Sequence, residues 1–296
     1  MSDGPLAGLD AVAWHLLHHA YGPATDVPDQ LRALRSPDPS RRAEALSRLF
    51  GNVYHQGTRW QASQAVVPFL VALADDPETP DRSTVVQLLR RIAVGDRRDD
   101  ELPFDAQRTF AAGKALDGAD HDEIIRRFHA EEEMADDEVE VLNAAAVRWA
   151  ADSYVSAAAR LATIVGWVSD PDDQVAAHAA ALAAWFEPTA ALVAALIAVT
   201  EHRARPRASA NLALAYVPTA DARIDRKLRE LTGSSIGTVA ITAAVASAYR
   251  DGGAISEPAL STLIEASERN DLEAVVGWDR HPRGFVMLAL QRLGLG

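Results

Sequence analysis

The chain has no cysteine, which excludes disulfide bonds, thiol catalysis and cysteine-ligated zinc. Aromatic residues make up only 6% of the 296 residues, and few segments show the alternating Val, Ile, Thr and aromatic pattern that strands need. Apolar runs such as Val193–Thr200 fall short of the roughly 18 residues that indicate a membrane-spanning helix. Because the first residues also lack the pattern of a signal peptide, we expect a cytoplasmic protein without a membrane segment.

Basic residues are in deficit: 29 Lys and Arg stand against 42 Asp and Glu, a net charge of −13 at pH 7. A chain of this charge repels phosphate backbones at long range, so a nucleic acid is not the expected partner. The glycines of Gly233–Gly237 lack both the preceding strand and the lysine of a phosphate-binding loop. Since no nucleophile, metal or cofactor motif emerges elsewhere, we expect neither a cofactor nor a metal.

Alanine-rich amphipathic helices are what the chain has in abundance, and two of them belong to a repeated phrase. Leu31–Phe50 and Ile164–Phe186 each contain an apolar helix end, a Ser/Asp-Pro-Asp turn, a polar helix start and an Ala/Leu-rich helix. Weaker copies follow at intervals of about 30 to 35 residues, which is the length of two helices and two turns. This self-similarity predicts an all-α fold, an α-solenoid of stacked antiparallel helix pairs. We expect one domain over residues 1–296, with an irregular insertion at about 95–104.

The repeated phrase resembles the HEAT and HEAT-like repeat family. The first copy carries the pattern on Leu31, Leu34, Ser36, Asp38, Arg42, Ala45 and Leu49, and the second on Val168, Asp170, Asp172, Val175, Ala179 and Leu182. The resemblance covers about residues 27–250 and weakens around residues 95–135. Gly51–Thr58 and the following Ala65–Leu70 are also similar to actinobacterial HEAT-repeat proteins of unassigned function.

The resemblance implies a curved solenoid whose concave side binds another macromolecule. Most members of the family are scaffolds or adaptors. A minority are enzymes, namely the alkylpurine DNA glycosylases with HEAT-like repeats and the bilin lyases.

The densest group of functional residue types lies between two predicted helices. It comprises Asn52, Tyr54, His55, Gln56, Thr58, Arg59 and Trp60. Polar and aromatic side chains together supply rigid contact area and hydrogen bonds, as the hot spots of protein interfaces do. A second interpretation is structural: His55, Gln56 and Thr58 cap helix ends while the two large aromatic side chains cover the hydrophobic seam.

A second compact group near the C-terminus comprises Trp278, Asp279, Arg280 and His281. Its structural interpretation is a loop that caps the last repeat. In the functional interpretation, Arg280 and Arg283 bind an acidic partner or a phosphate.

Three further segments of the sequence suggest binding sites that must be weighed against simpler structural roles. Asp10–Tyr21 is predicted to be a helix that places His15 and His19 on one face, but two imidazoles need at least one more ligand to hold a metal. The acidic run Glu131–Glu140 is either a solvated face or a recognition patch for a basic partner. Arg203, Arg205 and Arg207 could line a small anion site.

The function we expect is a non-catalytic protein-binding scaffold or adaptor that grips a protein partner on its concave face. An immunity-type or regulatory role fits this class, with the acidic chain neutralising a basic enzyme such as a nuclease. One alternative is an enzyme that acts on a small molecule or peptide through Tyr54, His55, Gln56 and His281. Another, less favoured, is a DNA-binding HEAT-like glycosylase that uses Trp149 with Asp152, or Trp185 with Glu187. The sequence does not indicate the oligomeric state.

Overall fold

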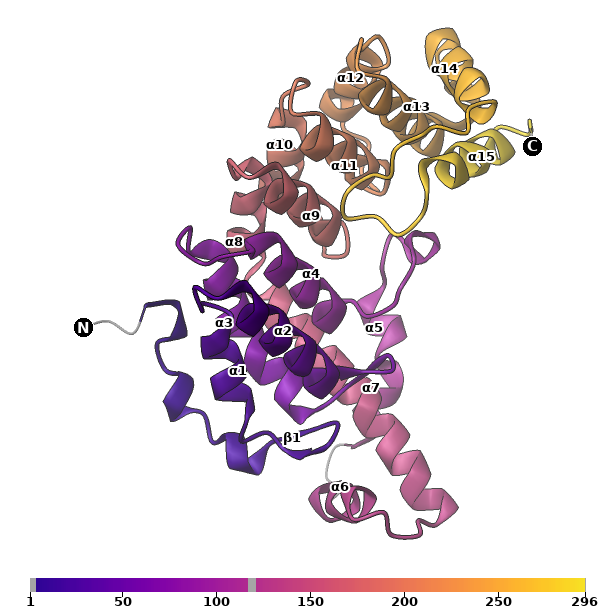
Figure 1. Ribbon diagram of the computed structural model, residues 1–296. Helices are drawn as coiled ribbons and strands as arrows, with labels where there is room; N and C mark the ends of the chain where they lie inside the picture. Colours follow the sequence, from indigo (N-terminus) through magenta and orange to yellow (C-terminus); the bar gives the residue numbers. More distant parts are fainter. Residues whose placement is uncertain (1–3, 117–120, 296) are drawn as a thin grey trace. The chain divides into compact units, whose positions relative to one another are not determined.

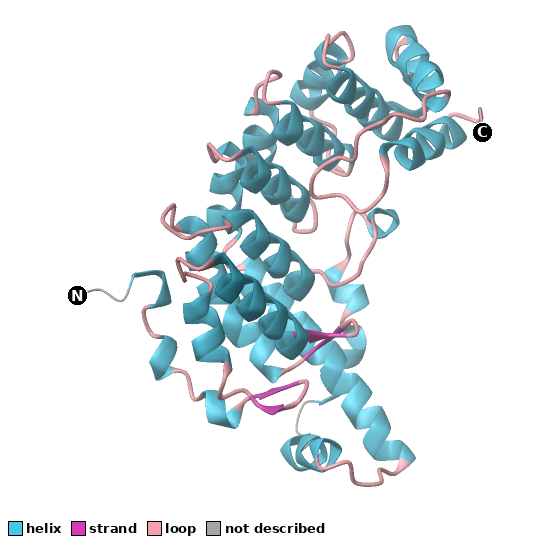
Figure 2. Ribbon diagram, viewed as in Figure 1, coloured by secondary structure: helices cyan, strands magenta, loops and turns pink. Residues whose placement is uncertain are grey.

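The computed structural model describes residues 4–116 and 121–295 (Figures 1 and 2). Most of this range is helical, with two short antiparallel strand pairs, and the expectation of an all-α protein is confirmed. Contacts divide the chain into two compact units. Unit 1 comprises Met1–Asp96 and Asp105–Arg160, and unit 2 comprises Arg97–Phe104 and Leu161–Gly296.

Unit 1 is built from helices and two strand pairs, one before the first α-helix and one between the second and the third. Its helices are α1 (Val27–Ala33), α2 (Pro39–Val53), α3 (Gln61–Asp75), α4 (Arg82–Ala93), α5 (Ala106–Thr109), α6 (His121–His129) and α7 (Asp136–Ala158). Its strands are β1 (His18–His19), β2 (Gly22–Pro23), β3 (Tyr54–His55) and β4 (Thr58–Arg59). Helix α1 packs on α2 and α3 on α4, while the long helix α7 contacts α3, α4 and α6.

Unit 2 consists of successive helix pairs. Its helices are α8 (Leu161–Gly166), α9 (Asp173–Ala183), α10 (Ala190–Ala198), α11 (Ala204–Ala215), α12 (Ala222–Leu231), α13 (Gly237–Asp251), α14 (Glu257–Ser267) and α15 (Pro282–Arg292). Helix α11 packs between α9 and α13, and α10 contacts both α8 and α12 (Figure 1). The last two helices pack on α13 and on each other.

The two copies of the repeated phrase have the same local structure. Before α2, the Ser36 hydroxyl accepts a hydrogen bond from the Asp38 amide, and Asp38 in turn caps the helix by accepting from the Ser40 amide at 2.9 Å. Before α9, the Asp170 side chain accepts a hydrogen bond from the Asp172 amide, and Asp172 in turn caps the helix by accepting from the Gln174 amide at 2.8 Å. Each Asp therefore satisfies an amide that a helix start leaves without a partner.

The predicted helix over Asp10–Tyr21 is wrong. The segment forms 3₁₀ turns at Leu9–Ala11 and Trp14–Leu16 and then enters strand β1. Two of its backbone amides donate to distant residues instead of to carbonyls one helical turn earlier. The His18 amide donates to the side chain of Gln61, and the Ala20 amide donates to the carbonyl of Asn52. As a result His15 and His19 do not share a helix face.

Small side chains let the central helices of unit 2 approach closely. Ala176, Ala180, Ala210 and Ala244 are fully buried or nearly so, in α9, α11 and α13. Close-packed Ala surfaces have no polar atoms of their own, so the few polar side chains among them must find partners there.

Arg207 of α11 is the largest side chain that is fully buried in this core. Its guanidinium donates to the carbonyls of Leu196 and Val199 at 2.8 and 2.9 Å and to the side chain of Asn211 at 3.0 Å. These carbonyls lie at the C-terminal end of α10, where a helix leaves acceptors unsatisfied. Burial lowers the pKa of Arg207 to about 10, so the side chain remains charged at neutral pH.

We expect Arg207→Met to lower the free energy of unfolding by about 2–4 kcal/mol, because methionine fills the space but leaves the buried carbonyls without a donor. Arg205→Met is the matched control, since Arg205 lies on the same helix and is exposed. Denaturant unfolding followed by circular dichroism measures both. Equal stability of the two variants would show that desolvation of the guanidinium offsets its hydrogen bonds.

Candidate functional site

Two β-hairpins in unit 1 carry most of the first predicted group. In one, His18 pairs with Pro23 and His19 with Gly22; in the other, Tyr54 pairs with Arg59 and His55 with Thr58. The second turn has positive φ angles at Gln56 (48°) and Gly57 (85°). Positive φ at both central residues is what a type I′ two-residue turn requires, and Gly57 adopts it without strain.

Contacts at the tip of the first hairpin join it to the end of α2 and to the second hairpin. The Ala20 amide donates to the Asn52 carbonyl at 2.9 Å. The Tyr21 hydroxyl lies 3.2 Å from Nδ1 of His55, and the two rings meet edge to face with centroids 5.2 Å apart. Tyr21 is nonetheless 66% exposed. A large aromatic side chain is thus held in place and left open to solvent.

A carboxylate, Asp26, anchors the base of the first hairpin. It accepts hydrogen bonds from Nε2 of His19 at 2.9 Å, from the Gln30 amide group at 2.7 Å and from the Asn52 amide group at 3.0 Å. Nδ1 of His19 accepts from the Tyr21 amide, which leaves the ring proton on Nε2. Since both nitrogens of His19 are engaged, the Asp–His pair is a positioning contact and not a general base.

Aromatic side chains from four parts of unit 1 form a second layer beside the hairpins. The imidazoles of His18 and His129 stack with centroids 5.3 Å apart, and His129 lies 5.5 Å from Trp60. Trp60 in turn stacks on Trp149 at 5.6 Å and contacts Phe128, which is 38% exposed. Burial lowers the pKa of His129, and the electrostatic influence of the nearby His18 and His19 lowers it further.

We call the following residues the hairpin cluster: His18, Tyr21, His55, Phe128 and His129. Each is at least partly exposed, and together they come from β1 and its turn, from β3 and from the end of α6.

The first predicted group divides into a buried and a surface half. Asn52, Tyr54, Arg59 and Trp60 are buried, which matches the structural interpretation for the two aromatic side chains. Arg59 donates to the Ile92 carbonyl at 3.0 Å and to the Gly57 carbonyl at 3.3 Å, so it supports the hairpin from inside. The surface half is His55, Gln56 and Thr58, and these side chains remain candidates for contact with a partner.

The second predicted group lies in unit 2 and is tied into that unit. Trp278 stacks on Tyr216 at 5.8 Å and donates from its indole nitrogen to Ser209 at 3.0 Å. Arg280 forms an ion pair of 2.7 Å with Asp99, which is buried. The His281 ring accepts from the Arg283 amide at the start of α15, as a helix cap does. Asp279 is exposed.

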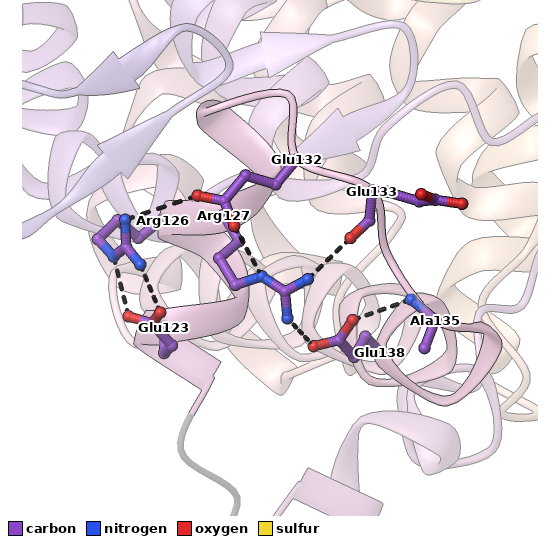
Figure 3. Close-up of polar contacts among 7 residues, drawn as sticks. All are labelled: Glu123, Arg126, Arg127, Glu132, Glu133, Ala135 and Glu138. Atoms are coloured by element: carbon purple, nitrogen blue, oxygen red, sulfur yellow. Dashed lines mark hydrogen bonds and ion pairs between the residues drawn. The ribbon is translucent and has the colours of Figure 1, made fainter.

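Arginine side chains already pair with part of the acidic run (Figure 3). Arg127 contacts the carboxylates of Glu132 and Glu138, and Arg126 contacts Glu123 and Glu132. Five other acidic side chains of the run are exposed and have no ion pair among the described residues: Glu131, Glu133, Asp136, Asp137 and Glu140. The network therefore fixes the α6–α7 connection and leaves a net negative surface around it.

Other residues singled out from the sequence are engaged inside their units. Trp149 and Trp185 are both buried. Arg203 forms an ion pair of 2.7 Å with Asp173, and Arg207 is wholly buried, so the three arginines do not line an anion site.

Sequence reasoning missed Asp26, Gln30 and His129 because they join the site only through the fold. Two signals for the hairpins were present: Gly22-Pro23 after His18-His19, and Gly57 between short polar segments. Within residues 4–116 and 121–295, no group of three or more His, Asp or Glu side chains could hold a metal ion.

No model of a known protein family matches the chain, and no curated protein is significantly similar to it. No helix in the described ranges combines the length and apolar character that crossing a bilayer demands.

We expect the protein to lose stability between pH 7.5 and pH 5, with His129 as one cause. Because its pKa is lower in the folded than in the unfolded chain, the unfolded chain binds more protons as the pH falls through about 6.5. His129→Phe keeps the ring stacking and removes the titration. The melting temperature of this variant should fall less on acidification than that of the wild type, whereas the exposed-residue control His15→Phe should match the wild type. An unchanged fall in His129→Phe would contradict the assignment.

Proposed function

We propose that the chain is a non-catalytic protein-binding scaffold built from HEAT-like helix pairs. The repeated phrase supports this architecture, since both copies use the same Ser/Asp and Asp capping contacts. The packing of unit 2 supports it as well, because α9, α11 and α13 contact one another in order and so do α8, α10 and α12. Each pair buries its apolar stripe against its neighbours, as repeat proteins do.

The observation that carries the proposal is the hairpin cluster. A helix pair needs only a short turn, yet the α2–α3 connection is a β-hairpin that contacts a second hairpin through Tyr21 and His55. Tyr21 is held by a hydrogen bond and a ring contact while two thirds of it is exposed. Preordered aromatic side chains lose little entropy on binding, which is why they dominate interface hot spots.

Charge indicates the chemistry of the partner. Unit 1 holds 24 acidic and 15 basic residues, a net charge of −9 out of the −13 of the whole chain. Its exposed carboxylates at Glu131–Glu140 follow directly after Phe128 and His129 of the hairpin cluster. An aromatic centre with an acidic rim suits a protein with a basic surface, since complementary charge speeds encounter and rejects acidic competitors. A cytoplasmic location and an immunity-type or regulatory role are part of this proposal.

Photo-crosslinking from the cluster tests the proposal. A photo-reactive phenylalanine analogue replaces Tyr21 in one variant and Met287 of unit 2, which is 45% exposed, in the control. In a lysate of the native cell, position 21 should capture proteins of basic isoelectric point that position 287 does not capture. Identical products from both positions, or acidic proteins alone, would count against the proposal.

Charge reversal distinguishes the effect of the acidic rim, the exposed carboxylates at Glu131–Glu140, on partner capture from the effect of the net charge of the protein. We expect Glu133→Lys with Asp137→Lys to reduce capture at position 21 by roughly tenfold or more at low salt, because encounter loses its steering. Glu257→Lys with Glu268→Lys changes the net charge equally on exposed positions of unit 2 and should have a much smaller effect. The two double variants are compared by the yield of crosslinked partner.

A further inference from the structure

Unit 2 contains a pocket of about 380 Å³ near the C-terminal ends of α13 and α15. Its walls include Leu102 and Pro103, Tyr216 and Pro218 of the region after α11, and Tyr249 of α13. The volume lies at the lower end of the range for small-molecule sites, and the walls combine aromatic and proline surfaces with charged groups, as such sites do. None of its lining residues belongs to the hairpin cluster or to unit 1.

Arg250 forms one wall of the pocket. Two carboxylates, Asp225 and Asp251, also line the pocket, and Arg250 neutralises that of Asp225. Its side chain is only 7% exposed, pairs with Asp225 at 3.0 Å, and donates to the carbonyls of Val217 and Thr219 at 2.8 and 3.1 Å. These bonds hold the α11–α12 connection against α13. With its donors committed, Arg250 shapes the pocket and offers little to a ligand.

Besides the paired Arg250 and Asp225, the lining contains two side chains of opposite charge, Asp251 and Arg292. The Asp251 carboxylate, half-buried at the end of α13, makes no hydrogen bond or ion pair with any described residue. Burial raises the pKa of Asp251, and the charge of Asp225 raises it further, as expected for a carboxylate that lacks a direct partner. The Arg292 guanidinium lies over the Tyr249 ring at 3.8 Å and likewise has no carboxylate within ion-pair distance in the described chain.

We propose that this pocket binds a small zwitterion, an amino acid in the general sense, with its ammonium group on Asp251 and its carboxylate on Arg292. The aromatic wall of Tyr216 and Tyr249 would then contact the carbon skeleton between the two charged groups. A pure anion would meet Asp251 and a pure cation would meet Arg292, so neither is complementary to the lining. The site is independent of the scaffold function and does not require it.

The first test compares matched probes on the full chain by isothermal titration calorimetry. The zwitterions are alanine, 4-aminobutyrate and 6-aminohexanoate, which differ in the separation of their charges. Hexylamine and hexanoate carry one charge each on the same skeleton as the longest probe. We expect at least one zwitterion to bind at least tenfold more tightly than both single-charge probes. The proposal is overturned if no zwitterion binds, or if hexylamine or hexanoate binds as well as the best of the three.

Variants then assign the two charges. Arg292→Gln and Asp251→Asn should each weaken binding of the best zwitterion by roughly tenfold or more, since each removes one charge-assisted hydrogen bond. Arg205→Gln and Glu268→Gln make the same changes of charge at exposed positions of unit 2 outside the pocket, and should bind as the wild type does. Melting temperatures show that all four variants are folded. Full affinity in Arg292→Gln or Asp251→Asn would refute the assignment.

Discussion

Polar side chains on a single helix, α11, hold the core of unit 2 together. Arg207 satisfies the carbonyls at the end of α10, Ser209 donates to the Ala177 carbonyl of α9, and Asn211 bonds to the Val239 carbonyl and Thr242 of α13. Helices that meet through alanine can slide along or rotate about one another at little cost, because small apolar surfaces are alike at each step. Directional hydrogen bonds in a dry interior remove that freedom, since any shift leaves a buried group without a partner.

The part of the fold that the sequence predicts is the part that local chemistry decides. Asp38 and Asp172 each precede a helix by one residue, and both act as its cap. The amphipathic spacing that follows them is enough to identify α2 and α9. Asp10–Tyr21 has a similar apolar spacing, but its amides bond to Gln61 and Asn52, which lie dozens of residues away. A pattern of neighbouring residues cannot reveal hydrogen-bond partners that lie this far away in the sequence.

The candidate site was predictable only in part, for the same reason. Polar and aromatic residues between α2 and α3 stand out because a turn between helices does not require them. Whether each one faces solvent is decided by its neighbours: Trp60 is covered by Trp149 and Phe128, while the ring of His55 contacts the exposed Tyr21. The histidines show the effect most clearly, since His18 and His129 are 111 positions apart in the numbering and stack face to face.

The ion pair between Asp99 and Arg280 joins positions 181 residues apart within unit 2. Asp99 belongs to a segment, Arg97–Phe104, that interrupts unit 1 in the order of the chain. During synthesis this segment leaves the ribosome before the rest of unit 1 and must wait for nearly all of unit 2. The two units are therefore interleaved in the gene: a single cut after Arg160 keeps all of unit 1 on one fragment but separates unit 2 from its segment Arg97–Phe104 and so from Asp99.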